Sequence, residues 1–168
     1  MKSLTWFDRK LVFGSHPEML PFHLERLEGT MVRLEHKVKG VGDKILSENL
    51  NNKWSVKQNI GHLAEVDEIG NRRMDEMISR VAMLSPAVFE PKDYNPWPIE
   101  KVLDYFRKTR AKNINKYKSL SERDLAKSSL HPRLKIQMTP VDLAWFDAEH
   151  DDHHLVKINE IIFTLTKT

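Results

Sequence analysis

The stretch TPVDLAWFDAEHDDHHLVKINEIIFTL, residues 139–165, decides the fold of this chain. Thr139 followed by Pro140 is typical of a helix start, because threonine caps free N–H groups and proline suits the first turn. An apolar stripe then recurs at steps of three and four, as on one face of a helix. Its members are Leu143, Phe146, His150, His154, Ile158, Ile161 and Leu165. The stretch therefore predicts the last helix of an all-α bundle, with two histidines on its inner face.

Two further helices are predicted in the first half of the chain. The first covers residues 17–39, where apolar side chains recur at steps of four and three and a glycine follows. The second opens at Ser55, which forms a capping-box pattern with Gln58, and its apolar stripe continues to Val81. Gly70 lies inside that stripe, where glycine either weakens a helix or lets another part of the chain approach closely.

Connections separate the predicted helices. They cover residues 41–53, 82–97 and 119–138. The middle one contains three prolines, so we predict a long loop that either covers a site or lets two helices run parallel. The third helix starts near Pro98. Because 168 residues suit one domain, we predict a single four-helix bundle over residues 1–168.

The composition narrows the class of protein. Hydrophobic residues make up 40% of the chain and charged residues 30%, as in ordinary globular domains. No apolar run approaches the roughly 20 residues of a membrane span, and the N-terminus does not resemble a signal peptide, so we expect a cytoplasmic protein. The absence of cysteine excludes disulfides, thiolate ligands and a cysteine nucleophile. Any thiol chemistry therefore needs a thiol from outside the chain.

Positive charge gathers in residues 101–139, which hold eleven lysines and arginines against three acids. Since the net charge of the whole chain is only +3, we interpret this segment as a solvated basic face and do not expect nucleic-acid binding. The alternative is attraction of an anionic ligand. Arg110 falls on the predicted inner face of the third helix, where it either reaches the rim or faces such a ligand.

Three histidines carry the strongest chemical signal. His150 and His154 lie one turn apart on one helix face, so both imidazoles can reach a single metal ion. His62 lies among apolar residues of the second helix and can face the same interior. Three imidazoles leave a coordination position open, as a catalytic metal site requires. The alternatives are hydrogen-bonded core histidines, or a pair formed by His150 with His153.

Neighbouring side chains are candidates for supporting roles. Glu65, one turn after His62, is a candidate base, and His153 is a second candidate proton carrier or a residue of the rim. Asp147, one turn before His150, is placed to accept the other ring N–H of that histidine. No histidine has a glutamate three residues before it, which disfavours a di-iron site and favours one metal ion. The other histidines are interpreted as structural or surface residues: His16, His23, His36 and His131.

Two motifs resemble the DinB/YfiT-like family of metalloproteins. They are WSVKQNIGHL, residues 54–63, and DAEHDDHHLVKI, residues 147–158. The resemblance implies a four-helix bundle, often a homodimer, with one divalent ion (nickel, zinc or iron) bound by His62, His150 and His154. It also implies either a transferase that uses a low-molecular-weight thiol such as bacillithiol, or a hydrolase.

These observations predict a metal-dependent enzyme that acts on a small molecule. The first hypothesis is a thiol S-transferase, in which the metal lowers the pKa of a bound thiol and Arg110 attracts an anionic cofactor. The second is metal-dependent hydrolysis, with Glu65 or His153 carrying a proton. The third is a non-catalytic, stress-related binding protein.

Overall fold

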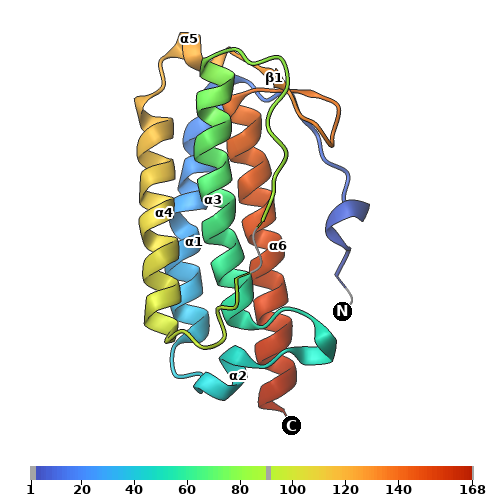
Figure 1. Ribbon diagram of the computed structural model, residues 1–168, viewed down its shortest axis with the longest axis vertical. Helices are drawn as coiled ribbons and strands as arrows, with labels where there is room; N and C mark the ends of the chain where they lie inside the picture. The colour runs from blue at the N-terminus through green and yellow to red at the C-terminus, as the bar shows by residue number, and fades with distance from the viewer. Residues whose placement is uncertain (1–2, 90–91, 168) are drawn as a thin grey trace.

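The computed structural model describes residues 3–89 and 92–167. Four long helices lie side by side along one axis (Figure 1). They are α1 (Leu20–Val38), α3 (Val56–Ile78), α4 (Ile99–Ser119) and α6 (Pro140–Thr166). The prediction of an all-α four-helix bundle is therefore confirmed.

The two helices that carry the candidate ligands begin at the caps that the sequence marks. Ser55 Oγ accepts a hydrogen bond from the Gln58 N–H at 3.1 Å, and Gln58 Oε1 accepts one from the Ser55 N–H at 2.9 Å. Thr139 and Asp142 form the same reciprocal pair at the start of α6. Asp142 Oδ1 also accepts from the two backbone N–H groups of residues 14–15, at 2.7 and 3.0 Å. This contact fixes the N-terminal segment against the first turn of α6.

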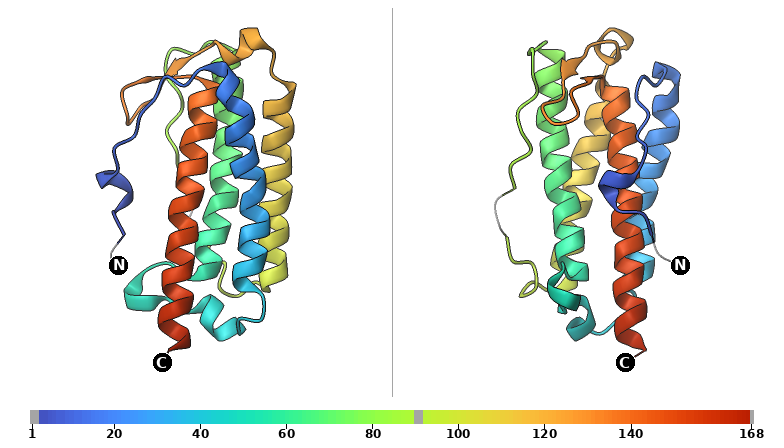
Figure 2. Two further views of the ribbon diagram at one scale, coloured as in Figure 1. Left: turned by 180° about the vertical axis from the view of Figure 1, so that it is seen from behind. Right: turned by 90° about the vertical axis from the view of Figure 1, so that its right-hand side faces the viewer.

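In the connection between the end of α3 and the start of α4, the described residues 82–89 and 92–97 run back along the bundle (Figure 2). As a result, α3 and α4 run in the same direction, whereas α1 and α6 run the opposite way (Figure 1). The loop also lies over the face between α3 and α6, where Phe89 contacts His62. The segment thus connects two parallel helices and also lies over His62, so the two alternatives considered for it are combined.

The predicted connections contain short regular elements that periodicity does not reveal. Residues 41–53 include helix α2 (Asp43–Ser47) and the 3-10 turn η3 (Leu50–Asn52). Residues 119–138 include helix α5 (Glu122–Leu125) and an antiparallel pair of strands, β1 (Ser129–Leu130) and β2 (Gln137–Met138). Two further 3-10 turns precede α1: η1 (Trp6–Asp8) and η2 (Pro17–Met19). Elements of two to five residues are too short to repeat an apolar period.

Two apolar clusters fill the interior. One contains Ile60, Phe106 and Ile158, and the other contains Leu27 and Met74. Burial of this apolar surface is the main stabilising contribution, at about 25 cal/mol per Å². Polar side chains of α3, α4 and α6 are buried at the level between the two clusters. None of the described helices combines the length and apolar character needed to cross a membrane.

Candidate metal centre

The structure brings together three histidines from two helices. His62 of α3 and His150 and His154 of α6 each offer a ring nitrogen, and these atoms all lie within 4.8 Å of one another. The two Nε2 atoms of His150 and His154 are 3.1 Å apart. Two ligand atoms on a tetrahedral ion with bonds of about 2.0 Å lie about 3.3 Å apart, so this spacing fits a shared metal ion.

Burial keeps the three imidazoles in the form that binds metal. His62 is 9% exposed and His154 is 6% exposed. Burial lowers the pKa of His62 to about 4 and that of His150 to about 3, and it holds the pKa of His154 well below its usual value. Because neutral imidazole is the metal-binding form, the rings are ready to coordinate an ion at neutral pH.

Asn59 orients one of these rings. Its Nδ2 donates to the Ser55 carbonyl at 2.7 Å, which turns its Oδ1 toward His154 Nδ1 at 2.7 Å. His154 Nδ1 must therefore carry the hydrogen, and its Nε2 keeps a lone pair on the side that faces His150 Nε2. Such outer contacts fix the tautomer of metal-binding histidines. Asn59 was not among the residues predicted from the sequence, although its position one turn before His62 on the same helix was a signal for it.

Aromatic side chains surround the histidines. The rings of Trp54 and Phe89 each lie 4.7 Å from the ring of His62, and Trp6 lies 5.2 Å from that of His150. These residues come from three segments outside the long helices. Their apolar faces limit the access of water, which strengthens electrostatic interactions inside the site.

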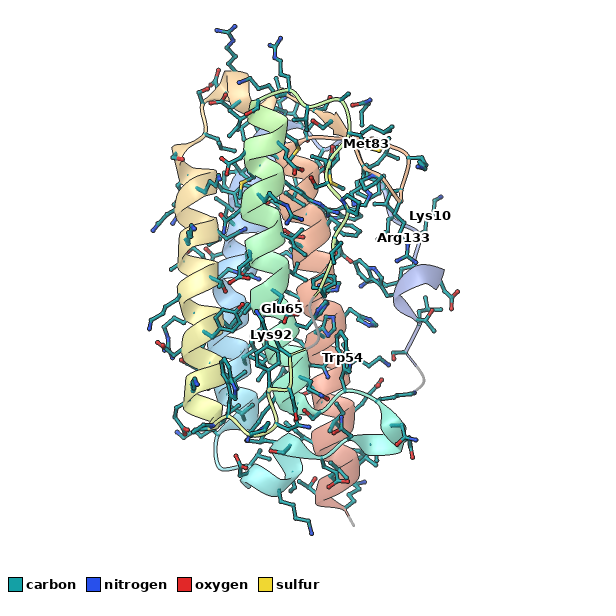
Figure 3. All side chains as sticks on the ribbon, viewed as in Figure 1. Lys10, Trp54, Glu65, Met83, Lys92 and Arg133 are labelled. Carbon is teal, nitrogen blue, oxygen red and sulfur yellow. The ribbon has the colours of Figure 1, made fainter. Side chains whose placement is uncertain are left out.

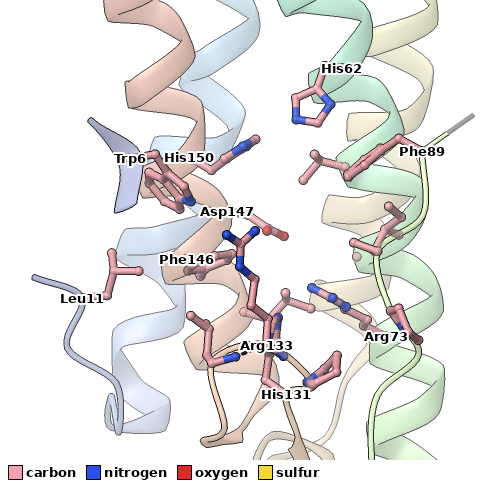
Figure 4. A pocket seen from close by; sticks show the side chains of 18 residues that line it. Trp6, Leu11, His62, Arg73, Phe89, His131, Arg133, Phe146, Asp147 and His150 are labelled. Atoms are coloured by element: carbon pink, nitrogen blue, oxygen red, sulfur yellow. Dashed lines mark hydrogen bonds between the residues drawn. The ribbon is translucent and has the colours of Figure 1, made fainter. Parts of the chain in front are cut away.

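Two cavities open onto His62. The larger, of about 610 Å³, lies between α3, α6 and the loops at one end of the bundle (Figure 4), and His150 also lines it. The smaller, of about 340 Å³, is lined by Trp54, Glu65, Lys92 and neighbouring residues (Figure 3). His62 and Phe89 line both cavities. The site can therefore be approached by a ligand from either side of Phe89.

The two candidate proton carriers occupy different environments. Glu65 lines the smaller cavity, accepts a hydrogen bond from Tyr94 Oη at 2.6 Å, and has a carboxylate oxygen 3.8 Å from His62 Nδ1. Burial raises the pKa of Tyr94, and Glu65 raises it further, so the phenol keeps its proton and holds the carboxylate. His153 is half-buried beside Trp6 and is absent from the described lining of both cavities. Glu65 is thus the better placed of the two.

Arg110 lies away from both cavities. It is 4% exposed and donates hydrogen bonds to Asp67 of α3, Asp151 of α6 and the carbonyl of Leu27 in α1. The shortest of these, from Nη1 to Asp151, is 2.6 Å. The structure therefore gives Arg110 a position in the bundle interior, where it neither reaches the rim nor faces a ligand cavity.

The larger cavity is also lined by polar residues. From the sequence, Asp147 was expected to orient His150, His131 was interpreted as a structural or surface residue, and Arg73 was not selected. Asp147 lines this cavity and is buried, and the described residues show no hydrogen bond between Asp147 and His150. The orienting contact expected from their spacing is therefore not made. Arg73 and His131 line the same cavity. A stretch of sequence separates them from the histidine motifs, so only the fold brings them together.

Comparison with known proteins connects this geometry to a family. The sequence model of the DinB superfamily matches residues 24–158. Among solved structures, the chain is similar to YfiT from Bacillus subtilis, which is described as a probable metal-dependent hydrolase with an unusual four-helix bundle topology. The two share 18% sequence identity, the alignment covers 94% of each chain, and the TM-score is 0.80. This likeness shows a common fold. No curated protein matches the chain.

Proposed function

Because the chain belongs to the DinB superfamily, we propose that it is an enzyme whose His62, His150 and His154 hold one divalent metal ion. The observation that supports this most is the approach of three ring nitrogens to within 4.8 Å of one another, on imidazoles whose lowered pKa values keep them neutral. A divalent ion bound there lowers the pKa of a thiol or a water molecule that it binds. Nickel, zinc and iron all suit an imidazole ligand set.

The reaction that we propose first is the transfer of a low-molecular-weight thiol, such as bacillithiol, to a small electrophile. A transfer needs two ligands at one centre, and two cavities meet at His62. The chain has no cysteine, so the sulfur comes with the thiol. The sulfur forms a bond to the electrophilic carbon, and the leaving group departs with its bonding electron pair. The thiol proton passes to Glu65, whose carboxylate lines the smaller cavity.

Hydrolysis is the second candidate, and the position of Glu65 favours it. The Tyr94 hydroxyl fixes this carboxylate next to His62. A base held in this way can take a proton from an attacking water molecule. The description of YfiT as a probable metal-dependent hydrolase supports the same proposal.

Metal analysis of the purified protein tests the proposal at its base. We expect about one equivalent of a divalent metal in the wild type and a loss of most of it in His154→Ala. His36→Ala, which changes an exposed histidine on α1, is the matched control and should keep the metal. Equal metal content in wild type and His154→Ala would refute the metal centre.

Activity then separates the two reactions. Metal-loaded protein is incubated with bacillithiol and a panel of electrophiles, and thiol consumption is followed. We expect consumption that His154→Ala abolishes. No consumption with any electrophile, together with ester hydrolysis that Glu65→Gln abolishes, would replace the transferase by the hydrolase.

A further inference from the structure

We propose that the larger cavity binds a ligand with an apolar body and one anionic head group, and that Arg73 is the residue that pairs with the head group. The inference deepens the proposed function, on which it rests for one point alone: that this ligand is the substrate.

Arg73 is a buried cation for which the described residues provide no ion-pair partner. It lies on α3 and is 6% exposed, and its guanidinium faces the cavity (Figure 4). Its Nε is buried without a hydrogen-bond acceptor, and no described residue forms an ion pair with Arg73 within 4.0 Å. A guanidinium carries five donors and stays charged at any ordinary pH. Leaving a buried charge unpaired is unfavourable, so an anionic partner from outside the chain is the natural complement.

The surroundings of Arg73 favour an anion. Arg133 lines the same cavity and adds a second positive charge. Burial lowers the pKa of His131 to about 4, and the charges of Arg73 and Arg133 lower it further, so the field around this histidine is positive. Asp147 is the acidic residue among the described cavity lining, and burial raises its pKa well above the usual value, which weakens its repulsion of an anion.

The remaining wall favours an apolar body. The cavity volume of about 610 Å³ is in the range of small-molecule sites. Most of its other lining is aliphatic or aromatic: Leu11, Val66, Ile69, Leu134, Leu143 and Phe146. A planar guanidinium binds a carboxylate or a phosphate through two parallel hydrogen bonds, which fixes the orientation of a ligand in such a pocket.

The spacing along α3 sets the length of the ligand. Arg73 follows His62 by eleven residues, which is about 16 Å along a helix axis. Helical side chains lean toward the N-terminus, so the guanidinium comes closer to His62 than that. A head group on Arg73 therefore leaves room for an apolar chain that reaches the histidines, and octanoate is a suitable probe.

Calorimetric titration of chelator-treated protein tests the pairing. The probes are octanoate, octyl phosphate and octan-1-ol, which share one chain and differ in the head group. We expect an anionic probe to bind at least about 10-fold more tightly than the alcohol, and Arg73→Met to weaken its binding by about 10- to 100-fold. Arg73→Lys should recover part of the affinity. Arg123→Met, which removes an exposed arginine of α5, should have no effect. Comparing octanoate with octyl phosphate identifies the head group.

Two results would overturn the inference. One is equal binding of the alcohol and both anions. The other is unchanged anion binding by an Arg73→Met protein whose circular dichroism matches that of the wild type. The titrations are repeated with His154→Ala. Anion binding that persists there without metal would support the cavity even if the metal centre failed. A stoichiometric metal with no preference for anions would keep the metal centre and reject the cavity.

Discussion

Two buried arginines on neighbouring helices of the bundle differ in their hydrogen bonding. Arg110 of α4 is 4% exposed, and Arg73 of α3 is 6% exposed. The guanidinium of Arg110 donates to both oxygens of Asp67, at 3.1 and 2.9 Å, and to both oxygens of Asp151, at 2.6 and 3.1 Å. The described part of the chain provides no such acceptor for Arg73. The fold thus supplies hydrogen-bond acceptors to the guanidinium of Arg110, whereas the described residues supply none to the Nε of Arg73.

The pKa values of the two arginines differ in the same sense as their hydrogen bonding. Burial alone would lower the pKa of Arg110, but the charges of Asp151 and Asp67 raise it. Burial lowers the pKa of Arg73, and the acids near it do not offset this. A buried charge with all its hydrogen bonds made has no capacity left for a ligand, whereas one without them has. Partnering, and not burial, therefore separates a structural polar residue from a binding one.

Replacement of Arg110, the arginine with all these acceptors, should have the largest effect on stability. Arg110→Met leaves two carboxylates buried without their cation, so we expect the free energy of unfolding to fall by about 3–5 kcal/mol. Urea unfolding followed by circular dichroism measures it. Arg107→Met, on the exposed face of the same helix, is the control and should cost much less. A loss for Arg110→Met no greater than that of the control would remove the distinction between the two arginines.

The second prediction applies the same distinction to a histidine. Asn59 completes the hydrogen bonding of one nitrogen of His154 and leaves the other for a metal ion. Asn59→Leu removes this support, so we expect a metal affinity about 10- to 100-fold lower. Asn59→Asp keeps an acceptor and should retain most of the affinity. Competition with a chromophoric chelator measures both. An unchanged affinity in Asn59→Leu would mean that packing alone orients the ring.

The parts of the fold that the sequence predicts are those with a repeating signal. The stripe of α6 and the caps at Ser55 and Thr139 depend on neighbours within four residues, and both are found where expected. The pair β1–β2 and the turn of α2 depend on contacts that are distant in the sequence or too short to show a period. Local patterns therefore predicted the long helices and could not reveal the short elements between them.

The same distinction applies to the candidate site: contacts within one helix were predictable from the sequence, and contacts between helices were not. His150 and His154 share one helix, so their spacing alone brings them together. The surroundings of Arg110 required knowledge of which faces of α3 and α6 meet α4, because Asp67 and Asp151 come from those helices. For this reason its position on an inner face suggested a ligand, although the structure shows an internal ion pair. Arg73 had no sequence signal, because the lack of an ion-pair partner among the described residues depends on which side chains the fold brings next to it.

The third prediction concerns the pH dependence of stability that arises from His131, which lines the larger cavity together with Arg73. His131 Nδ1 accepts hydrogen bonds from the backbone N–H groups of Arg133 and Leu134, which requires a neutral ring. The pKa of His131 is about 4 in the folded protein, compared with about 6.5 for an unfolded chain. The unfolded chain therefore takes up the proton first as the pH falls. This contribution to stability is complete above pH 6.5 and is lost between pH 6.5 and about pH 4.

His131→Asn isolates that contribution, because asparagine keeps an acceptor and does not titrate. We expect the stability difference between wild type and variant to shift against the wild type by at most about 1.4 kcal/mol per pH unit in this window. Urea unfolding at several pH values measures the difference. A difference independent of pH would show that the ring titrates normally and that the positive field inside the cavity is absent.

The smallest expected effect is that of Arg73→Met on stability, and it is the most direct test of the comparison. Methionine is apolar and flexible enough to occupy the space of the arginine stem, and it removes a buried charge that the described residues do not pair. We therefore expect the free energy of unfolding in the absence of ligand to stay the same or rise by up to about 1 kcal/mol. The same urea titration as for Arg110→Met measures it. A loss comparable to that of Arg110→Met would mean that Arg73 is held by the protein after all. A variant that is as stable as the wild type, but has lost anion binding, is what a residue kept for a ligand should give.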